Sequence, residues 1–132
     1  MKLRIQDNSV RLRLTRTEVD SLDEHGEVAA FTAFPGEQAL RYAVTSGKAD
    51  RVGARLDAHA IVVTIPAVEV HDWATSERVS IHGSEPLAGG ESLAILVEKD
   101  FACLKPREGE DESDMFPHPG FPSGQRGGDE TC

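Results

Sequence analysis

Cysteine is scarce in this sequence, with two residues among 132. A chain of this length can bury a hydrophobic core without covalent cross-links, so we expect no disulfide framework. The length also matches one folded domain of ordinary size.

Long hydrophobic runs are absent as well. The longest apolar stretches lie near residues 60–65 and 93–97, far short of the roughly 20 residues that a membrane-spanning helix needs. Residues 1–7 contain no apolar stretch of the kind that secretory signals carry, so we expect a cytoplasmic protein with no membrane partner. The net charge of -9 excludes the overall basic character of many nucleic-acid-binding proteins.

Recognisable catalytic motifs are missing too. The sequence contains no Gly-x-Ser-x-Gly, no phosphate-binding glycine loop and no His-Glu-x-x-His, which mark three large classes of enzyme. We therefore predict no catalytic residue and no cofactor, and we favour a role other than catalysis.

The charge that is present is unevenly distributed. A basic cluster near the N-terminus consists of Lys2, Arg4, Arg11, Arg13 and Arg16. An acidic cluster near the C-terminus consists of Glu108, Glu110, Asp111, Glu112 and Asp114. Residues 105–132 are rich in proline and glycine and poor in apolar side chains, which predicts a mostly irregular acidic tail after a folded domain over residues 1–104. Met115 and Phe116 are the apolar residues expected to hold part of this tail against the domain.

An internal repeat organises residues 1–104. A shift of 51 positions places Val10, Leu12 and Leu14 on the matching apolar residues Ile61, Val63 and Ile65. We predict two copies, over about residues 2–46 and 53–98, each with two strands, a short helix and two further strands.

Local patterns support this unit. Alternating apolar and basic residues predict a hairpin over residues 2–14 with a turn at Asp7 and Asn8. Thr15 and Glu18 form a capping-box pattern at the start of a helix, and Gly26 suits its end. Further strands are expected at about 27–34 and 38–45 in copy one, and at about 77–82 and 92–99 in copy two.

The predicted fold class is α+β and mostly β, with two ββαββ repeats packed as one barrel-like or sandwich domain with two short helices. The expected core consists of Leu3, Ile5, Val10, Leu12, Leu14, Val19, Leu22, Val28, Ile61, Val63, Ile65, Val70, Trp73, Val79, Leu93, Ile95 and Val97.

Each copy resembles the swapped-hairpin unit of AbrB/MazE-type DNA-binding domains. The matching segments are Asn8-Ser9, Arg13-Leu14 and Gly26-x-Val28 in copy one, and Ile65-Pro66 and Val79 in copy two. The resemblance implies hairpins that interlock between two chains to make one barrel, and DNA binding through basic residues from both halves. We infer that two copies in one chain would supply both halves internally, as a monomeric pseudo-dimer. Copy two lacks those basic residues.

The whole chain is also similar to a bacterial family of uncharacterised proteins. The similarity involves the opening segment from Lys2 to Thr15, the segment from Leu96 to Leu104, and the segment from Glu110 to Pro117 before the terminal Cys132. It implies no known activity.

The basic cluster is the first candidate site. With a two-residue turn, Ile5 pairs with Val10, Arg4 with Arg11, Leu3 with Leu12 and Lys2 with Arg13. Four cations then share one face of the hairpin, and opposed like charges destabilise a strand pair. Solvent, acidic side chains or a bound anion such as phosphate would compensate for this repulsion, and we favour a solvated face with local acidic partners.

The acidic cluster and a Cys/His set are the remaining candidates. The acidic residues are expected to be solvated, to fold back on the basic face, or to bind a basic partner. Cys103, His118 and Cys132 are weak metal candidates, because their wide spacing is not a recognised zinc pattern. We therefore predict no metal.

Two functional hypotheses follow from these residues. The first is a non-catalytic binding or interaction module that uses the basic hairpin and the acidic tail to contact a protein partner. The second is a DNA-binding regulator or antitoxin-like protein of the swapped-hairpin kind, so nucleic acid remains an alternative that we do not favour. The expected oligomeric state is a monomer or a homodimer.

Overall fold

The computed structural model describes residues 1–101 and 113–117. Strand, strand, helix, strand, strand is the order of elements in the first half, and the second half follows the same order with one added 3-10 turn. The elements are β1 (Lys2–Gln6), β2 (Ser9–Leu14), α1 (Arg16–His25), β3 (Glu27–Phe34), β4 (Gln38–Gly47), β5 (Gly53–Asp57), β6 (Ala60–Pro66), α2 (Ala67–Thr75), β7 (Ser80–Pro86), η1 (Ala88–Gly90) and β8 (Ser92–Lys99).

The strands form two four-stranded sheets, and each sheet contains one hairpin from each half. Sheet A has the order β1-β2-β8-β7, and sheet B has the order β3-β4-β6-β5. The central contacts, β2 with β8 and β4 with β6, are parallel, while the hairpin contacts are antiparallel. The predicted class, α+β and mostly β, is confirmed. The described strands form a sandwich and no closed barrel, and a duplication as the origin of the two halves stays a prediction.

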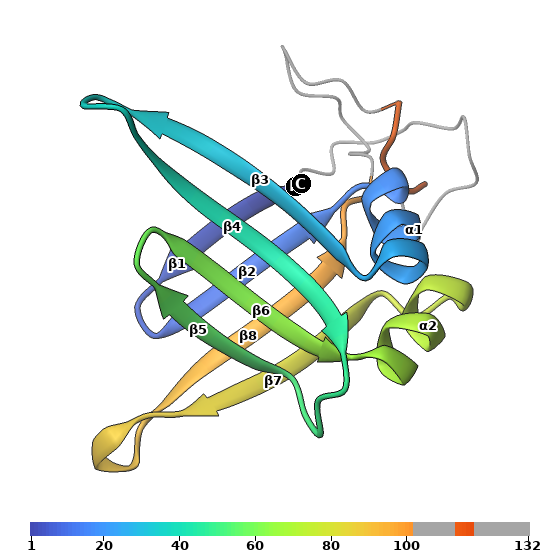
Figure 1. The fold of residues 1–132 in the computed structure, drawn as a ribbon. Coiled ribbons are helices and arrows are strands. Elements are labelled where there is room, and N and C mark those ends of the chain that lie inside the picture. The colour runs from blue at the N-terminus through green and yellow to red at the C-terminus, as the bar shows by residue number, and fades with distance from the viewer. Residues whose placement is uncertain (102–112, 118–132) are drawn as a thin grey trace, which may run out of the picture.

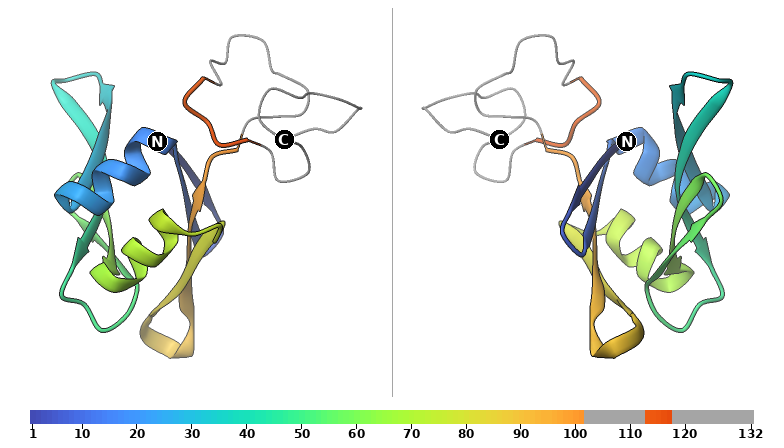
Figure 2. Two further views of the ribbon diagram at one scale, coloured as in Figure 1. Left: turned by 90° about the vertical axis from the view of Figure 1, so that its right-hand side faces the viewer. Right: turned by 90° about the vertical axis from the view of Figure 1, so that its left-hand side faces the viewer.

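The two helices lie at one end of the sandwich, between the sheets (Figures 1 and 2). The strands of the two sheets cross in Figure 1, and all four hairpin turns lie at the end away from the helices. This arrangement follows from the connections, because β2 and β6 end where the helices begin and β3 and β7 start where the helices end.

The N-terminal signal of α1 works as predicted. The Thr15 side chain accepts a hydrogen bond from the Glu18 N–H, and the Glu18 side chain accepts one from the Thr15 N–H. Gly26 ends the helix with φ 86°, in the left-handed region that favours glycine. Pro66 precedes α2 without any side-chain cap, so that helix relies on its packing.

The core lies between the sheets and under the helices. Alternate residues of β2 face inward, and Leu12, Leu14, Val63 and Trp73 are completely buried. Two core predictions are wrong, since Ile5 is 58% exposed and Val79 is 41% exposed. Further buried hydrophobic residues that the prediction omitted are Ala43, Val44, Val52, Val62 and Ile81.

Each wrong core assignment has a structural reason. Ile5 pairs with buried Val10 and so faces the core side, but it lies near the β1 end, beyond the cover of sheet B. Val79 precedes β7, which begins at Ser80 and not at residue 77, and Ile81 takes the core position. The Val79 carbonyl instead accepts a hydrogen bond from Trp73 Nε1 at 3.0 Å.

One edge of the sandwich is joined by a polar contact. Glu85 of β7 accepts hydrogen bonds from the Arg51 guanidinium at 2.7 Å and from the Ala54 N–H at 3.2 Å. These two hydrogen bonds hold the pKa of the Glu85 carboxyl below its ordinary value. The contact links sheet A to the start of β5 in sheet B.

Phe116 packs against the core cluster, as the sequence predicts. Its ring makes an edge-to-face contact with Phe101, with the centroids 5.8 Å apart, and its N–H donates to the Asp100 carbonyl at 2.9 Å.

Neither described helix is long and apolar enough to cross a membrane.

Candidate anion-binding face

The outward side of sheet A carries the predicted basic cluster. The strand register is the one expected, with Lys2 opposite Arg13 and Arg4 opposite Arg11. Because directly opposed residues of a strand pair share a face, these four cations lie together. We call this surface, made by Lys2, Arg4, Arg11 and Arg13, the basic hairpin face.

The partner strands extend this face into rows that cross the whole sheet. One row contains Arg4, Arg11, Leu96 and His82, and each residue is paired in register with the next. The row beside it contains Lys2, Arg13, Glu98 and Ser80 in the same order of strands. The sheet thus brings together side chains from both ends of the described chain.

Glu98 is the main compensating group for the crowded cations. Its Oε1 accepts hydrogen bonds from Arg11 Nε and Arg13 Nε, both at 2.7 Å, and Arg11 Nη2 lies 2.6 Å from the same atom. Lys2 Nζ lies 3.4 Å from Asp100 Oδ2, a carboxylate that is only 4% exposed. Local acidic partners, the interpretation favoured from sequence, are therefore present.

Arg4 differs from its neighbours. Within residues 1–101 and 113–117 it pairs with no carboxylate, and its Nη2 donates to Gln6 Oε1 at 3.2 Å. It is exposed, so its guanidinium is available to an anion.

A cavity of about 330 Å³ adjoins Arg4 on this face. Ala94 and Leu96 of β8 are among the residues that line it. Arg4 and Arg11 line one side and His82 lines the other, and His82 Nε2 lies 3.2 Å from Ser80 Oγ. The exposed Arg4 guanidinium, with Arg11 and an imidazole beside the same hollow, is suited to hold a carboxylate or a phosphate, although Arg11 already contacts Glu98.

Arg16 stands apart from the other predicted cations. It begins α1, its guanidinium lies 5.2 Å from the centre of the Phe116 ring, and its N–H donates to the Asp114 carbonyl at 3.0 Å. Asp114 also accepts from the Thr17 hydroxyl at 2.8 Å. Hydrogen bonds from the Thr15 and Thr17 side chains hold the pKa of Asp114 below its usual value.

Asp114 therefore contacts the N-terminal turn of α1 and not the basic hairpin face. The other acidic candidates, Glu108, Glu110, Asp111 and Glu112, lie outside the described residues, as do Cys103, His118 and Cys132. Within the described ranges, no three His, Cys, Asp or Glu side chains are grouped closely enough to hold a metal.

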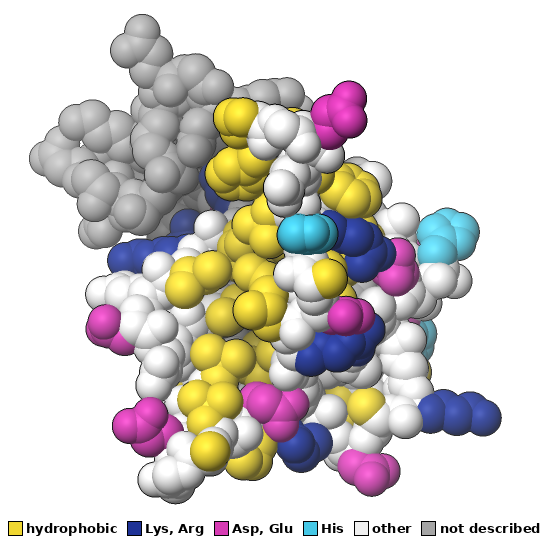
Figure 3. Space-filling view, turned by 60° about the vertical axis from the view of Figure 1, so that its left-hand side comes forward, with side chains coloured by type: hydrophobic (Ala, Val, Ile, Leu, Met, Phe, Trp, Pro, Cys, Tyr) yellow, Lys and Arg dark blue, Asp and Glu magenta, His cyan; other side chains and the backbone are white. Residues whose placement is uncertain are grey.

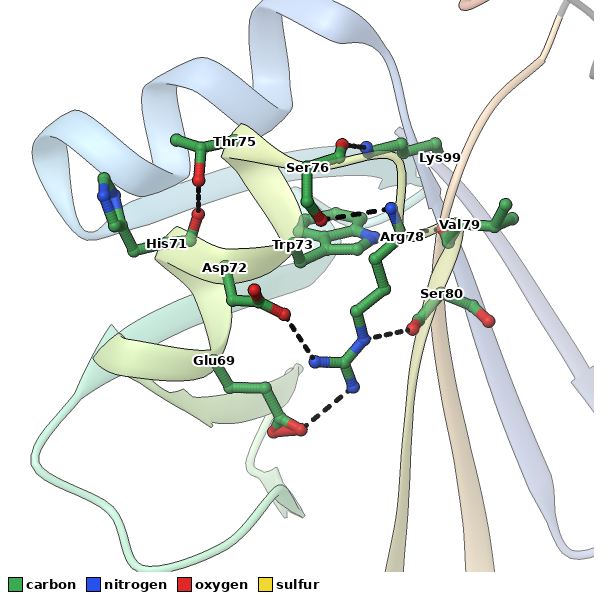
Figure 4. A network of polar contacts seen from close by, with 10 residues as sticks. All are labelled: Glu69, His71, Asp72, Trp73, Thr75, Ser76, Arg78, Val79, Ser80 and Lys99. Carbon is green, nitrogen blue, oxygen red and sulfur yellow. Dashed lines mark hydrogen bonds and ion pairs between the residues drawn. The ribbon is translucent and has the colours of Figure 1, made fainter.

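A second polar network surrounds the end of α2 (Figure 4). Arg78 donates to Glu69 at 3.2 Å, to Asp72 at 3.4 Å and to the Ser80 carbonyl at 3.0 Å. Because Arg78 uses three donors on groups of α2 and β7, it fixes the helix to the following strand and leaves little capacity for a ligand.

The sequence predicts the cations of the basic hairpin face but not the residues that accompany them, Glu98 and His82. Glu98 lies in the strand expected at about 92–99 and His82 at the end of the strand expected at about 77–82, and neither is predicted as a site residue. The available signal was the alternation in residues 92–99, which places Glu98 on the outward face of its strand. Nothing local shows that this strand lies beside residues 9–14.

Comparison with known proteins adds one match. The model of a family of unknown function (DUF7009) matches residues 1–120. No curated protein and no solved structure matches the chain, and the likeness of each half to the AbrB/MazE-type unit is not shown. Since the family model spans most of the sequence, the chain belongs to this family of unknown function, DUF7009.

Proposed function

We propose that this protein is a non-catalytic binding module whose basic hairpin face holds an anionic group of a partner. The observation that supports the proposal is the cavity that Arg4, Arg11 and His82 line together. Arginine stays charged at every physiological pH, so the face attracts carboxylates and phosphates without any titration step.

The remaining charge favours a modest, salt-sensitive interaction. Glu98 and Asp100 offset part of the four positive charges, and Arg4 keeps a guanidinium free of carboxylate among the described residues. Exposed ion pairs contribute little individually and are screened by salt. We therefore expect the affinity of the site for an anion to fall as ionic strength rises.

Isothermal titration of the full chain with inorganic phosphate and with an acidic peptide tests this proposal. Arg4→Gln should remove most of the binding, because the substitution keeps a polar side chain and removes the guanidinium with its charge. Arg55→Gln is the matched control, since Arg55 occupies the aligned position of the second half and is exposed on sheet B. Equal loss of binding in both variants would contradict the assignment of the site.

DNA is the second candidate ligand, favoured by the exchange of hairpins between the two halves. In sheet B, the outward face of β5 and β6 corresponds to the basic hairpin face. This surface disfavours DNA binding, because Arg55 is the single cation of these two strands. If DNA binds, the affinity for random duplex should fall by orders of magnitude between about 50 and 200 mM salt. The double variant Arg11→Glu and Arg13→Glu should then abolish binding while circular dichroism shows the fold intact.

A further inference from the structure

The end of the sandwich opposite the helices exposes inward-facing apolar side chains. Ile5 shares the face of buried Val10, and Leu56 is paired with Ile61 on the core side of sheet B. Ile5 is 58% exposed, Phe34 53% and Leu56 76%. We call the surface formed by Ile5, Phe34 and Leu56 the apolar mouth.

The space-filling view shows that apolar surface is exposed on this side of the molecule. In Figure 3, hydrophobic side chains form a band that runs along this side of the molecule, with charged side chains at its margins. Contiguous apolar surface rimmed by polar groups marks interaction sites more often than isolated exposed residues do. At the other end of the sandwich, Val70 and Trp73 of α2 and Val19 and Leu22 of α1 cover the equivalent space.

A hollow lies at the margin of the apolar mouth. A cavity of about 460 Å³ is lined by residues of the β3–β4 hairpin, including Phe34 and Leu40, and by Ala58 and His59 of the β5–β6 turn. Such a hollow is large enough to accept an aliphatic or aromatic side chain, which is how anchor residues of a partner bind.

The charge of the surrounding turns decides the kind of partner. Three of the four hairpin turns at this end contain one carboxylate, namely Asp7, Glu37 and Glu91, and the fourth hairpin has Asp57 at the end of β5; the turns contain neither lysine nor arginine. Arg55 lies 4.0 Å from Asp57 and offsets one of these charges weakly. The turns around the apolar mouth are therefore acidic, and we call their carboxylates, together with Asp57, the acidic rim.

From the apolar floor and the acidic rim we infer that the apolar mouth is a docking site for a basic amphipathic segment of another protein. Apolar side chains of that segment would fill the space that the helices fill at the opposite end, and its lysines or arginines would approach the carboxylates of the acidic rim. A second copy of this chain fits less well, because two acidic rims would then face one another. This inference concerns a different surface from the basic hairpin face and does not rest on its function.

Binding of synthetic peptides to the full chain tests the inference. The probes are an amphipathic peptide of leucine and lysine and a peptide of the same length and pattern with glutamate in place of lysine. We expect the lysine peptide to bind at least about tenfold more tightly, which corresponds to about 1.4 kcal/mol. Equal affinity for the two peptides would overturn the inference.

Matched variants locate the binding surface. Leu56→Ser should weaken binding of the lysine peptide about tenfold, and the fold should survive because the Leu56 side chain is largely exposed. Val68→Ser is the control, since Val68 is 84% exposed on α2, outside the apolar mouth. An equal effect of both variants, or none from Leu56→Ser, would overturn the assignment.

Two further results would identify a different occupant and refute the inference. One is a concentration-dependent dimer in sedimentation experiments that Leu56→Ser dissociates, which would assign the apolar mouth to a second copy. The other is binding to phosphatidylcholine vesicles without binding to either peptide, which would assign it to lipid. Asp57→Asn combined with Glu37→Gln should reduce the preference for the lysine peptide if the acidic rim acts as inferred.

Discussion

Replacing Glu98 by glutamine isolates the contribution of the carboxylate that neutralises the basic hairpin face. The substitution keeps the size of the side chain and removes the negative charge between Arg11 and Arg13. The two arginine side chains are 33% and 26% exposed and the glutamate side chain is 13% exposed, so the pairs are partly shielded from water.

The magnitude follows from this partial burial. A charge-assisted hydrogen bond contributes about 1.5–3 kcal/mol, whereas an exposed ion pair contributes about 1 kcal/mol or less. Glu98 makes two such pairs at intermediate exposure, and glutamine keeps one neutral acceptor. We therefore expect a loss of about 2 kcal/mol in the free energy of unfolding, or about 6–10 °C in Tm for a domain of this size.

Added anion gives the decisive comparison. In Glu98→Gln the two arginines lack their shared carboxylate, so inorganic phosphate should raise the Tm of the variant more than that of the wild type at equal ionic strength. Thermal unfolding followed by circular dichroism, with chloride and phosphate buffers matched in ionic strength, measures both effects. The control is Glu91→Gln, an exposed turn residue, for which we expect a change within about 0.5 kcal/mol. A Tm loss below about 2 °C for Glu98→Gln, or equal stabilisation of variant and wild type by phosphate, would refute the reasoning.

Two further predictions concern packing and pH. A Cβ at Gly83 would lie 2.5 Å from Val52 Cγ1 and 2.6 Å from Val52 Cβ. Gly83→Ala should therefore lower the free energy of unfolding, measured with urea, by about 1–3 kcal/mol. Adding Val52→Ala to the same chain should recover part of this loss if the overlap is the cause. Lys99 is 6% exposed, and burial lowers its pKa. The unfolded chain therefore binds the Lys99 proton more tightly than the folded chain does. The stability of the wild type relative to Lys99→Met should then rise as the pH increases from the folded pKa towards the ordinary lysine value. A stability difference that stays constant across alkaline pH would contradict this reading of Lys99.

The two halves of the chain build each sheet jointly, so the stability of each sheet depends on both halves. Each sheet pairs a hairpin from residues 1–47 with one from residues 53–99 along a parallel contact. Each half alone therefore contains two-stranded hairpins and no complete sheet, and isolated two-stranded hairpins are only marginally stable in water. The central parallel pairs also explain why charges from β1, β2 and β8 meet on one face.

Local structure was predictable because its signals act over a few residues. The two-residue turn at Asp7 and Asn8 predicts the register of β1 with β2, down to the opposition of Arg4 and Arg11. Alternation then predicts which side chains share a face, because side chains alternate strictly along a strand. The capping box at Thr15 and Glu18 predicts the start of α1 because its two hydrogen bonds join residues three positions apart.

Burial at the ends of strands was not predictable in the same way. The pattern of residues 2–6 makes Ile5 a core residue, yet it is 58% exposed, because the cover of a strand end depends on how far the opposite sheet extends. The same limit applies to Leu56, whose exposure creates the apolar mouth. Alternation identifies the face of a sheet on which a side chain lies, and only the packing of the second sheet determines whether that position is covered.

By itself, the sequence determined the secondary structure, the mostly β class and the presence of four cations on one hairpin face, because all three depend on short-range periodicity and composition. Only the tertiary structure decided that Glu98 lies between Arg11 and Arg13 and that His82 lines the same cavity as Arg4 and Arg11. The physical reason is that strands become neighbours when their pairing buries whole faces of the sheet. This pairing brings Glu98 to Arg11 and Arg13, which lie 87 and 85 positions away in the sequence.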